Sequence, residues 1–326
     1  MKPIALLTIG QVAVHAHQVL VGVGILLSLA LASIVARKAA LPKRSYFMFA
    51  PLAVLLGFMF AHFFYCMASF EQVLYDLPPG TFFHFWDGRY MLYGGMVGCV
   101  LAAWVAAKLT HCSALRMLDA IAPAGIMMIV FVRVAQGLQG NGYGDYLEEG
   151  SPFARFPFAV FDAYYMEWTW ALFIIAALYA VILLFLLLTR KGKFPGDLAL
   201  FLIGLYAAGQ IILESLRRDD FLRWGFVRCS QVASTALVIF TLFCYALRVR
   251  KQRTTGKALC WIVCIAMLTL CLLLEFAVEG RIAFLLFLTP QGCYVAMACA
   301  CLVLIGCICW MRALSQDSAQ KISHRS

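Results

Sequence analysis

One strongly apolar stretch of the sequence contains an arginine followed by a glycine-rich segment. Arg133 follows six apolar residues, and Gln136, three positions later, would lie on the same face of a helix. Glycines occupy four of the eight positions from 137 to 144, which allows tight backbone turns and a close approach of N–H groups to a ligand. A guanidinium donates two parallel hydrogen bonds to two phosphate oxygens. The pattern favours a phosphate-binding site; the alternative is an arginine that extends outward to a membrane surface.

A polar stripe occurs farther along the chain. Tyr206, Gln210, Glu214 and Arg217 recur at spacings of four, four and three residues, which predicts one face of a helix. Such a face should contact protein or a water-filled cavity rather than lipid. Glu214 could neutralise Arg133 or Arg217 when no anionic ligand is bound. The alternative is an internal ion pair that only fixes helix packing.

A third segment combines charged and aromatic residues with glycines. Residues 86–89 (Trp-Asp-Gly-Arg) precede Tyr93, and Gly94 and Gly98 are four positions apart. Small residues at this spacing allow two helices to pack closely. We therefore expect a helix–helix contact at these two glycines.

The composition shows what kind of element must position these residues. Of 326 residues, 64% are hydrophobic and only 13% are charged, and the mean hydropathy is +0.89. A soluble domain has about half apolar and a quarter charged residues. The composition therefore excludes a water-soluble enzyme, a disordered chain and a nucleic-acid-binding protein, and it indicates an integral membrane protein.

Nine apolar stretches approach or exceed the roughly 20 helical residues that cross a bilayer. They lie at about 12–35, 46–70, 90–107, 118–138, 166–189, 197–216, 226–247, 258–278 and 283–311. The last is interrupted near Pro290, so we expect it to cross at about 293–311. Because backbone groups in lipid must be satisfied within the segment, the expected fold is an all-α polytopic membrane protein.

The charges of the connecting segments predict the orientation of the chain. The net charge is +10, and basic residues gather at 37–44, 108–116, 190–193, 248–257 and 312–325. Acidic residues gather instead at 71–87, 145–167 and 275–279, while the stretch 217–228 mixes both signs. Because basic loops tend to stay in the cytoplasm, we expect the N-terminus outside and the C-terminus in the cytoplasm.

The thirteen cysteines and six histidines do not indicate a metal site. Most of the cysteines lie within apolar runs, where a thiol packs as a small hydrophobic group, and paired CxxC motifs are missing from the sequence. His15 and His17 are two positions apart and would point to different sides of a helix. We expect neither a metal nor another cofactor.

Taken in chain order, these segments resemble the prolipoprotein diacylglyceryl transferase family. Its members move a diacylglyceryl group from phosphatidylglycerol to the lipobox cysteine of secreted prolipoproteins. The resemblance covers residues from about 12 to 247, or seven spans, and includes the family's orientation. The segments that carry it are 85–88 with 93–98 (the family's W-D-G…H-G-G-L-I-G), 119–123 (D-x-x-A-P), 133–144 (G-R-x-G-N-F-x-N-x-E-x-x-G), Tyr206…Gln210…Glu214…Arg217 (Y…R…E…R) and Ser230-Gln231 (G/S-Q).

The resemblance implies roles for individual residues. The catalytic candidates are Tyr93, His17 and Glu214. The substrate-binding candidates are Arg133, Gln136, Asn141, Gly144, Tyr206, Gln210 and Arg217. Several residue types depart from the family pattern, which has a histidine at Tyr93, asparagines at Gln136 and Gln139, a glutamate at Asn141, an arginine at Gln210 and a tyrosine at His17.

The resemblance also implies a domain division and partners. Residues 1–250 would form the transferase-like membrane core, and residues 251–326 would add two spans and a short cytoplasmic tail. The implied partners are phosphatidylglycerol, the signal peptide of a prolipoprotein and membrane lipids, in a bacterial plasma membrane and with no nucleic acid. The changed polar residues leave an inactive lipid-binding or regulatory relative as the alternative. A transporter is disfavoured, because the sequence shows no inverted repeat.

Overall fold

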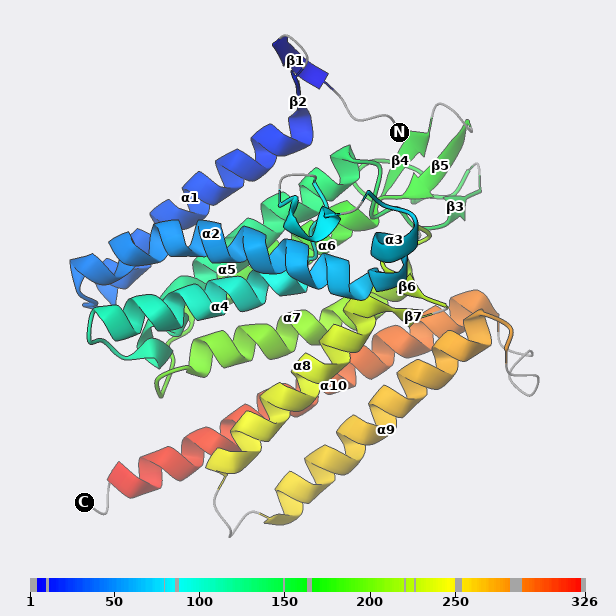
Figure 1. Ribbon diagram of the computed structural model, residues 1–326. Coiled ribbons are helices and arrows are strands. Elements are labelled where there is room, and N and C mark those ends of the chain that lie inside the picture. The colour runs from blue at the N-terminus through cyan, green and yellow to red at the C-terminus, as the bar shows by residue number, and fades with distance from the viewer. Residues whose placement is uncertain are drawn as a thin grey trace. The chain divides into compact units, whose positions relative to one another are not determined.

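Long apolar helices dominate the computed structural model of the protein (Figure 1). Within the part of the chain that the structure describes, nine are long and apolar enough to cross a membrane, which confirms the predicted all-α polytopic class. They are α1 (Ala16–Lys38), α2 (Lys43–Ala68), α4 (Leu92–Leu109), α5 (Ala114–Leu138), α6 (Leu172–Thr189), α7 (Asp197–Ser215), α8 (Cys229–Arg248), α9 (Thr254–Val278) and α10 (Pro290–Ser323). The structure describes residues 5–9, 12–78, 80–85, 88–148, 150–162, 166–219, 221–225, 227–249, 254–281 and 289–323.

Two helix boundaries differ from the predicted spans for identifiable reasons. Helix α6 begins at Leu172 instead of about 166, because residues 167–170 form a β-strand. Helix α10 begins at Pro290, where the sequence predicts an interruption. Proline is well suited to the first helical position, where its missing N–H costs nothing, and Thr289 Oγ1 accepts a hydrogen bond from the Gly292 N–H at 3.2 Å. Residues 283–288 of the expected span lie outside the described residues.

Short elements fill the segments between the helices. After α2 come α3 (Phe70–Tyr75) and the 3-10 helix η1 (Thr81–Phe83). Strands β3 (Tyr146–Leu147), β4 (Ala159–Asp162) and β5 (Glu167–Trp170) form an antiparallel sheet in the order β3-β5-β4, and β6 (Arg223–Trp224) pairs with β7 (Val227–Arg228). These small sheets position the loops that carry several candidate residues.

The N-terminal hairpin changes the expected geometry of two histidines. Strand β1 (Ala5–Ile9) pairs antiparallel with β2 (Val12–His15), so α1 begins at Ala16. His15 therefore ends a strand instead of lying on the helix, and its ring stacks on that of His17 with centroids 5.5 Å apart. The expectation that these two side chains point to different sides is wrong.

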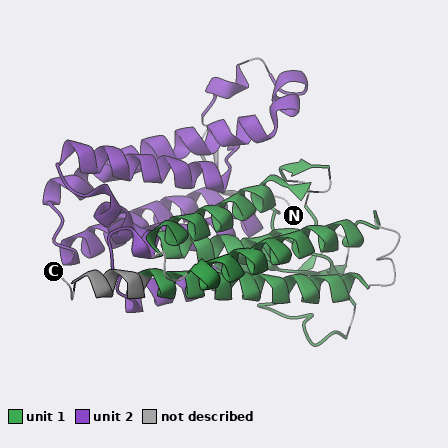
Figure 2. Ribbon diagram, turned by 90° about the horizontal axis from the view of Figure 1, so that it is seen from below, with its two compact units in different colours: residues 1, 140–179, 200–326 green, residues 2–139, 180–199 purple. Residues whose placement is uncertain are grey.

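The chain forms two compact units, and the purple one in Figure 2 is unit 2. Unit 2 comprises Lys2–Gln139 and Ala180–Ala199. Within it α2 packs against α4, and α1 packs against α5. Its core places Phe49 and Met117 among many alanines. Small side chains at helix contacts allow the backbones to approach closely.

Gly94 and Gly98 form the predicted contact surface on α4, directly against α2. A Cβ atom at Gly98 would overlap the carbonyl group of Leu56 and lie 2.9 Å from the Cα of Gly57. We expect Gly98→Ala to destabilise the protein by about 1–3 kcal/mol, because an added methyl group forces packed backbones apart. Thermal unfolding in detergent would measure the loss.

Gly125→Ala on α5 is the matched control for this prediction. A Cβ atom there meets nothing within 4 Å, so alanine should be neutral or stabilise the helix by up to about 1 kcal/mol. Equal losses of stability in the two variants would contradict the role of Gly98 in close packing.

Unit 1, green in Figure 2, comprises Gly140–Tyr179 and Leu200–Ser326. Helix α7 is largely buried. Its Gly204 lies so close to α8 that a Cβ atom there would be 2.7 Å from Thr241 Cγ2. On its other side, the Tyr179 hydroxyl of α6 donates to the Leu205 carbonyl oxygen at 2.5 Å. Helix α10 packs against α8 and α9, so these three helices share one compact unit, and the division at residue 250 stays a prediction.

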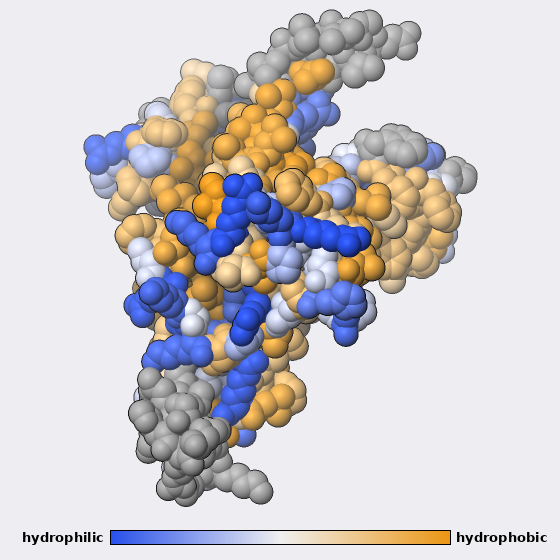
Figure 3. Space-filling model, turned by 90° about the vertical axis from the view of Figure 1, so that its left-hand side faces the viewer, coloured by the Kyte–Doolittle hydropathy of each residue, from blue (hydrophilic) through white to orange (hydrophobic). Residues whose placement is uncertain are grey.

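Large apolar side chains point outward from many of the helices. Leu26 on α1, Phe185 on α6, Leu247 on α8 and Leu302 on α10 are each 67–70% exposed. Figure 3 shows broad apolar surface in orange beside hydrophilic side chains in blue on one face. Extensive exposed apolar surface on long helices suits contact with lipid. The protein is a multi-pass membrane protein.

Candidate functional site

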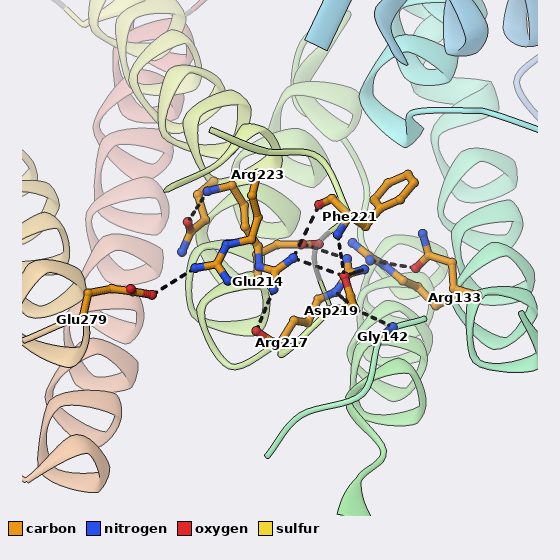
Figure 4. Close-up of polar contacts among 11 residues, drawn as sticks. Arg133, Gly142, Glu214, Arg217, Asp219, Phe221, Arg223 and Glu279 are labelled. Carbon is orange, nitrogen blue, oxygen red and sulfur yellow. Dashed lines mark hydrogen bonds and ion pairs between the residues drawn. The ribbon is translucent and has the colours of Figure 1, made fainter. Parts of the chain in front are cut away.

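Four charged side chains form a cluster where α7 ends and α8 begins (Figure 4). Arg217 pairs with Glu214 (Nη1–Oε2, 2.8 Å) and with Asp219 (Nη2–Oδ1, 2.9 Å). Arg228 pairs with Asp219 at 3.2 Å and donates from Nη2 to the Arg217 carbonyl oxygen at 2.7 Å. None of the four side chains is more than 14% exposed. Two buried cations are therefore balanced by two buried carboxylates, and we call these four residues the charge cluster.

Asp219 contacts both arginines of the charge cluster and the glycine-rich loop. Its Oδ2 accepts hydrogen bonds from Arg217 Nε at 2.9 Å and from the backbone N–H of Gly142 at 2.8 Å. Burial by itself raises the pKa of the Asp219 carboxyl. The charges of Arg217 and Arg228 outweigh burial, and the Gly142 hydrogen bond adds to them, so the pKa lies below its ordinary value. Asp219 is consequently ionised at neutral pH.

The glycine-rich loop is bonded within unit 1 through its own N–H groups. Gly140 and Gly142 have φ values of 85° and 79°, which favour glycine. The Gly144 N–H donates to the Trp170 carbonyl oxygen at 2.8 Å, and a Cβ atom at Gly144 would lie 2.9 Å from the Trp170 Cβ. With Gly142 bonded to Asp219, both of these N–H groups are used within the protein rather than by a ligand.

Arg133 is buried in α5, with 4% of its surface exposed. Its Nη1 donates to Gln136 Oε1 at 3.0 Å, as the shared helical face predicts. This burial contradicts the alternative in which the side chain extends outward to the membrane surface. An ionisable group inside an apolar span is costly to keep, and such a group is more often functional than structural.

The polar stripe of α7 faces protein, as its spacing predicts. Tyr206, Gln210 and Glu214 are each at most 2% exposed. The helix ends at Ser215, so Arg217 lies beyond it and not on the stripe itself. Arg217 nevertheless contacts Glu214 through the 2.8 Å ion pair, which confirms the predicted neutralisation of one by the other.

The remaining candidates lie at helix ends and in a loop. Tyr93 lies in the first turn of α4 and is 5% exposed, whereas His17 lies in the first turn of α1 and is partly buried. Asn141 is a partly buried loop residue. Trp86 and Asp87, which belong to the motif before Tyr93, lie outside the described residues. Among the candidates, contacts join Arg133 with Gln136 and Glu214 with Arg217.

Sequence reasoning did not single out Asp219, Arg228 or His62. The mixed-charge stretch 217–228, which is the exception to the alternating loop charges, could have indicated Asp219 and Arg228. For His62 the signal was a histidine within an apolar span. Its ring nitrogens lie 3.0 Å from the Thr81 carbonyl oxygen and 3.2 Å from that of Arg89, so it holds the loop that precedes Tyr93.

Further polar contacts join loops and helix ends within each unit. Asp119, near the start of α5, accepts hydrogen bonds from the backbone N–H groups of Gly196 (2.7 Å) and Ala199 (3.0 Å), and so caps α7. In unit 1, two ion pairs join the mixed-charge stretch 217–228 to the acidic segments 145–167 and 275–279: Arg218–Asp145 and Arg223–Glu279. Which side faces the cytoplasm stays a prediction.

Comparison with known proteins shows the family of this chain. The family model described as prolipoprotein diacylglyceryl transferase matches residues 3–247, which leaves α9 and α10 beyond the match. A phosphatidylglycerol–prolipoprotein diacylglyceryl transferase of Halalkalibacterium halodurans is 24% identical over 263 residues, or 78% of this chain and 89% of the relative. Proteins of the same name from Geobacillus kaustophilus (25% identity; 77% and 94% coverage) and Limosilactobacillus reuteri (26%; 74% and 90%) are similar over comparable lengths. The chain belongs to the prolipoprotein diacylglyceryl transferase family.

Proposed function

We propose that this protein transfers a diacylglyceryl group from phosphatidylglycerol to the lipobox cysteine of prolipoproteins. The observation that carries the proposal is the buried Arg133 inside an apolar span of a chain that belongs to this family. Relatives at 24–26% identity are named for this activity. The proposed location is a bacterial plasma membrane, with the N-terminus outside and the C-terminus in the cytoplasm.

The proposed reaction is a nucleophilic displacement at a glycerol carbon. The cysteine sulfur forms a bond to the terminal carbon of the diacylglyceryl group, and the bond from that carbon to a phosphate oxygen breaks. The electron pair of the broken bond leaves with glycerol phosphate, and the thiol proton passes to a base. A thiol with a pKa of about 8.5 needs only modest help to ionise. The greater demand is to hold the phosphate and stabilise the charge that grows on it.

Named residues can meet these demands. In this proposal Arg133 binds the phosphate and Gln136 orients the guanidinium through their 3.0 Å hydrogen bond. Arg217 acts as a second cation, which Glu214 orients through the ion pair. The candidate proton acceptors are Tyr93 and His17, and the remaining substrate-binding candidates are Asn141, Gly144, Tyr206 and Gln210.

An inactive lipid-binding or regulatory protein is the second candidate function. The polar residue types that depart from the family pattern favour it. So does the bonding of the Gly142 and Gly144 N–H groups to Asp219 and Trp170, since these groups then do not stabilise a phosphate. Such a protein would bind phosphatidylglycerol without forming a thioether.

Mass spectrometry of a lipobox peptide distinguishes the two functions. The full-length protein in detergent is incubated with phosphatidylglycerol and a synthetic peptide that contains the lipobox cysteine. A peptide with serine in place of that cysteine is the control. We expect the cysteine peptide alone to gain one diacylglyceryl group, with release of an equal amount of glycerol phosphate. Binding of the lipid without any adduct would favour the inactive alternative.

A further inference from the structure

Helix α9 lies beyond the residues matched by the family model, yet its C-terminal end reaches the segment that carries the charge cluster. The Ser215 hydroxyl donates a hydrogen bond to Glu275 Oε2 at 2.5 Å. Ser215 is the last residue of α7 and directly follows Glu214. Glu275 is thus attached to the helix end that supplies one carboxylate of the charge cluster.

The same carboxylate reaches the beginning of α8. The side-chain amide of Gln231 hydrogen-bonds to Glu275. The Oε1 of Gln231 in turn accepts a hydrogen bond from the backbone N–H of Arg228 at 3.0 Å. Glu275 therefore connects both ends of the segment 216–228, and this segment contains Arg217, Asp219 and Arg228.

We infer that Glu275 is a positioning residue for the charge cluster. Through Glu275, helix α9 then contributes to the proposed site. Because Gln231 Oε1 is already bonded to Arg228, its NH₂ group must face Glu275. The Glu275 carboxylate accepts from both Ser215 and Gln231. A glutamine at 275 can still accept from Gln231 and donate to the Ser215 hydroxyl, but both hydrogen bonds then lose the strengthening that the carboxylate charge provides. Glu275→Ala should lose both bonds. The kinetic consequence of this inference rests on the proposed function; the structural consequence does not.

Hydrogen exchange measured by mass spectrometry tests the structural consequence in the full-length protein in detergent. Glu275→Ala should speed exchange of the 216–228 segment by about tenfold, and Glu275→Gln by less, because local opening becomes easier when hydrogen bonds are lost. Helices α1 to α5 should exchange as before. Unchanged exchange of the 216–228 segment in Glu275→Ala would overturn the inference, as would a uniform increase over the whole of unit 1.

Glu279→Gln, one residue beyond the end of the same helix, is the matched control. Glu279 is four positions from Glu275 and pairs with Arg223, but the two side chains are 34% and 27% exposed. Removal of the same charge from this more exposed pair should leave the exchange of residues 216–219 nearly unchanged. An increase there as large as that of Glu275→Ala would show that any acidic residue at this end of α9 has the effect, and would overturn the specific role of Glu275.

Transfer kinetics test the consequence for the site. If the unaltered protein forms the lipobox adduct, Glu275→Ala should lower kcat by about tenfold with little change in the KM for the peptide, and Glu275→Gln should recover part of that loss. Normal kcat in both variants would overturn the link to the site. If the unaltered protein forms no adduct, the proposed function fails, and the exchange experiment alone decides whether Glu275 positions the cluster.

Discussion

Replacement of Arg133 by alanine should abolish diacylglyceryl transfer while the protein still inserts into membranes. Loss of a group that stabilises charge in the transition state costs on the order of 10²–10³ in rate. Arg133 is the buried cation to which we assign that role. Insertion should not suffer, because an arginine within a membrane helix opposes insertion, by up to about 2.5–3.5 kcal/mol at the helix centre. Adduct formation per amount of membrane-inserted protein measures the effect.

Two further variants make this result specific. Arg116→Ala removes an exposed arginine from the same helix and should leave transfer close to that of the unaltered protein. Arg133→Lys keeps the charge but loses the planar guanidinium that matches two phosphate oxygens. Its transfer rate should therefore lie between those of Arg133→Ala and Arg116→Ala. Transfer at the normal rate in Arg133→Ala would remove Arg133 from the mechanism.

Replacement of Asp219 by alanine should cause the largest loss of stability among substitutions in unit 1. It leaves Arg217 and Arg228 with Glu214 as the remaining carboxylate of the charge cluster. Removal of one partner from a buried ion pair costs about 3–5 kcal/mol, because the other charge stays buried without compensation. Chemical unfolding in mixed micelles gives the change in the free energy of unfolding.

Asp145→Ala is the control for this prediction. Asp145 also pairs with an arginine, Arg218, but their side chains are 52% and 66% exposed. A solvent-exposed pair contributes about 0–1 kcal/mol. Similar losses of unfolding free energy in the Asp219 and Asp145 variants would contradict this prediction, because they would show that the buried ion pairs contribute no more to stability than the exposed pair.

The depressed pKa of Asp219 also fixes the direction of a pH dependence. A carboxyl whose pKa is lower in the folded than in the unfolded state stabilises the fold above its unfolded pKa, which is about 3.9. That stabilisation is lost as the pH falls through the folded value. The unaltered protein should therefore lose stability below about pH 4 more steeply than Asp219→Asn. Parallel acid unfolding curves would contradict this.

The sequence by itself determined the membrane class, the positions of the spans and several helix faces. Lipid offers no hydrogen bonds to the backbone, so a long apolar stretch has few alternatives to a helix. The common face of Tyr206, Gln210 and Glu214 follows from the helical period alone. The close helix–helix contact at Gly94 and Gly98 follows from their lack of side chains, which lets another backbone approach. Such features depend on residues within a few turns of one another.

Only the tertiary structure decided which charges neutralise one another. Asp219 bonds to Gly142, 77 positions away, and Glu275 bonds to Ser215, 60 positions away. A local pattern shows that a buried charge needs a partner, but several carboxylates in the chain meet that need equally well by type. A buried arginine pairs with the carboxylate that helix packing brings within hydrogen-bond distance. The energy of a buried pair depends on its geometry as well as its charges.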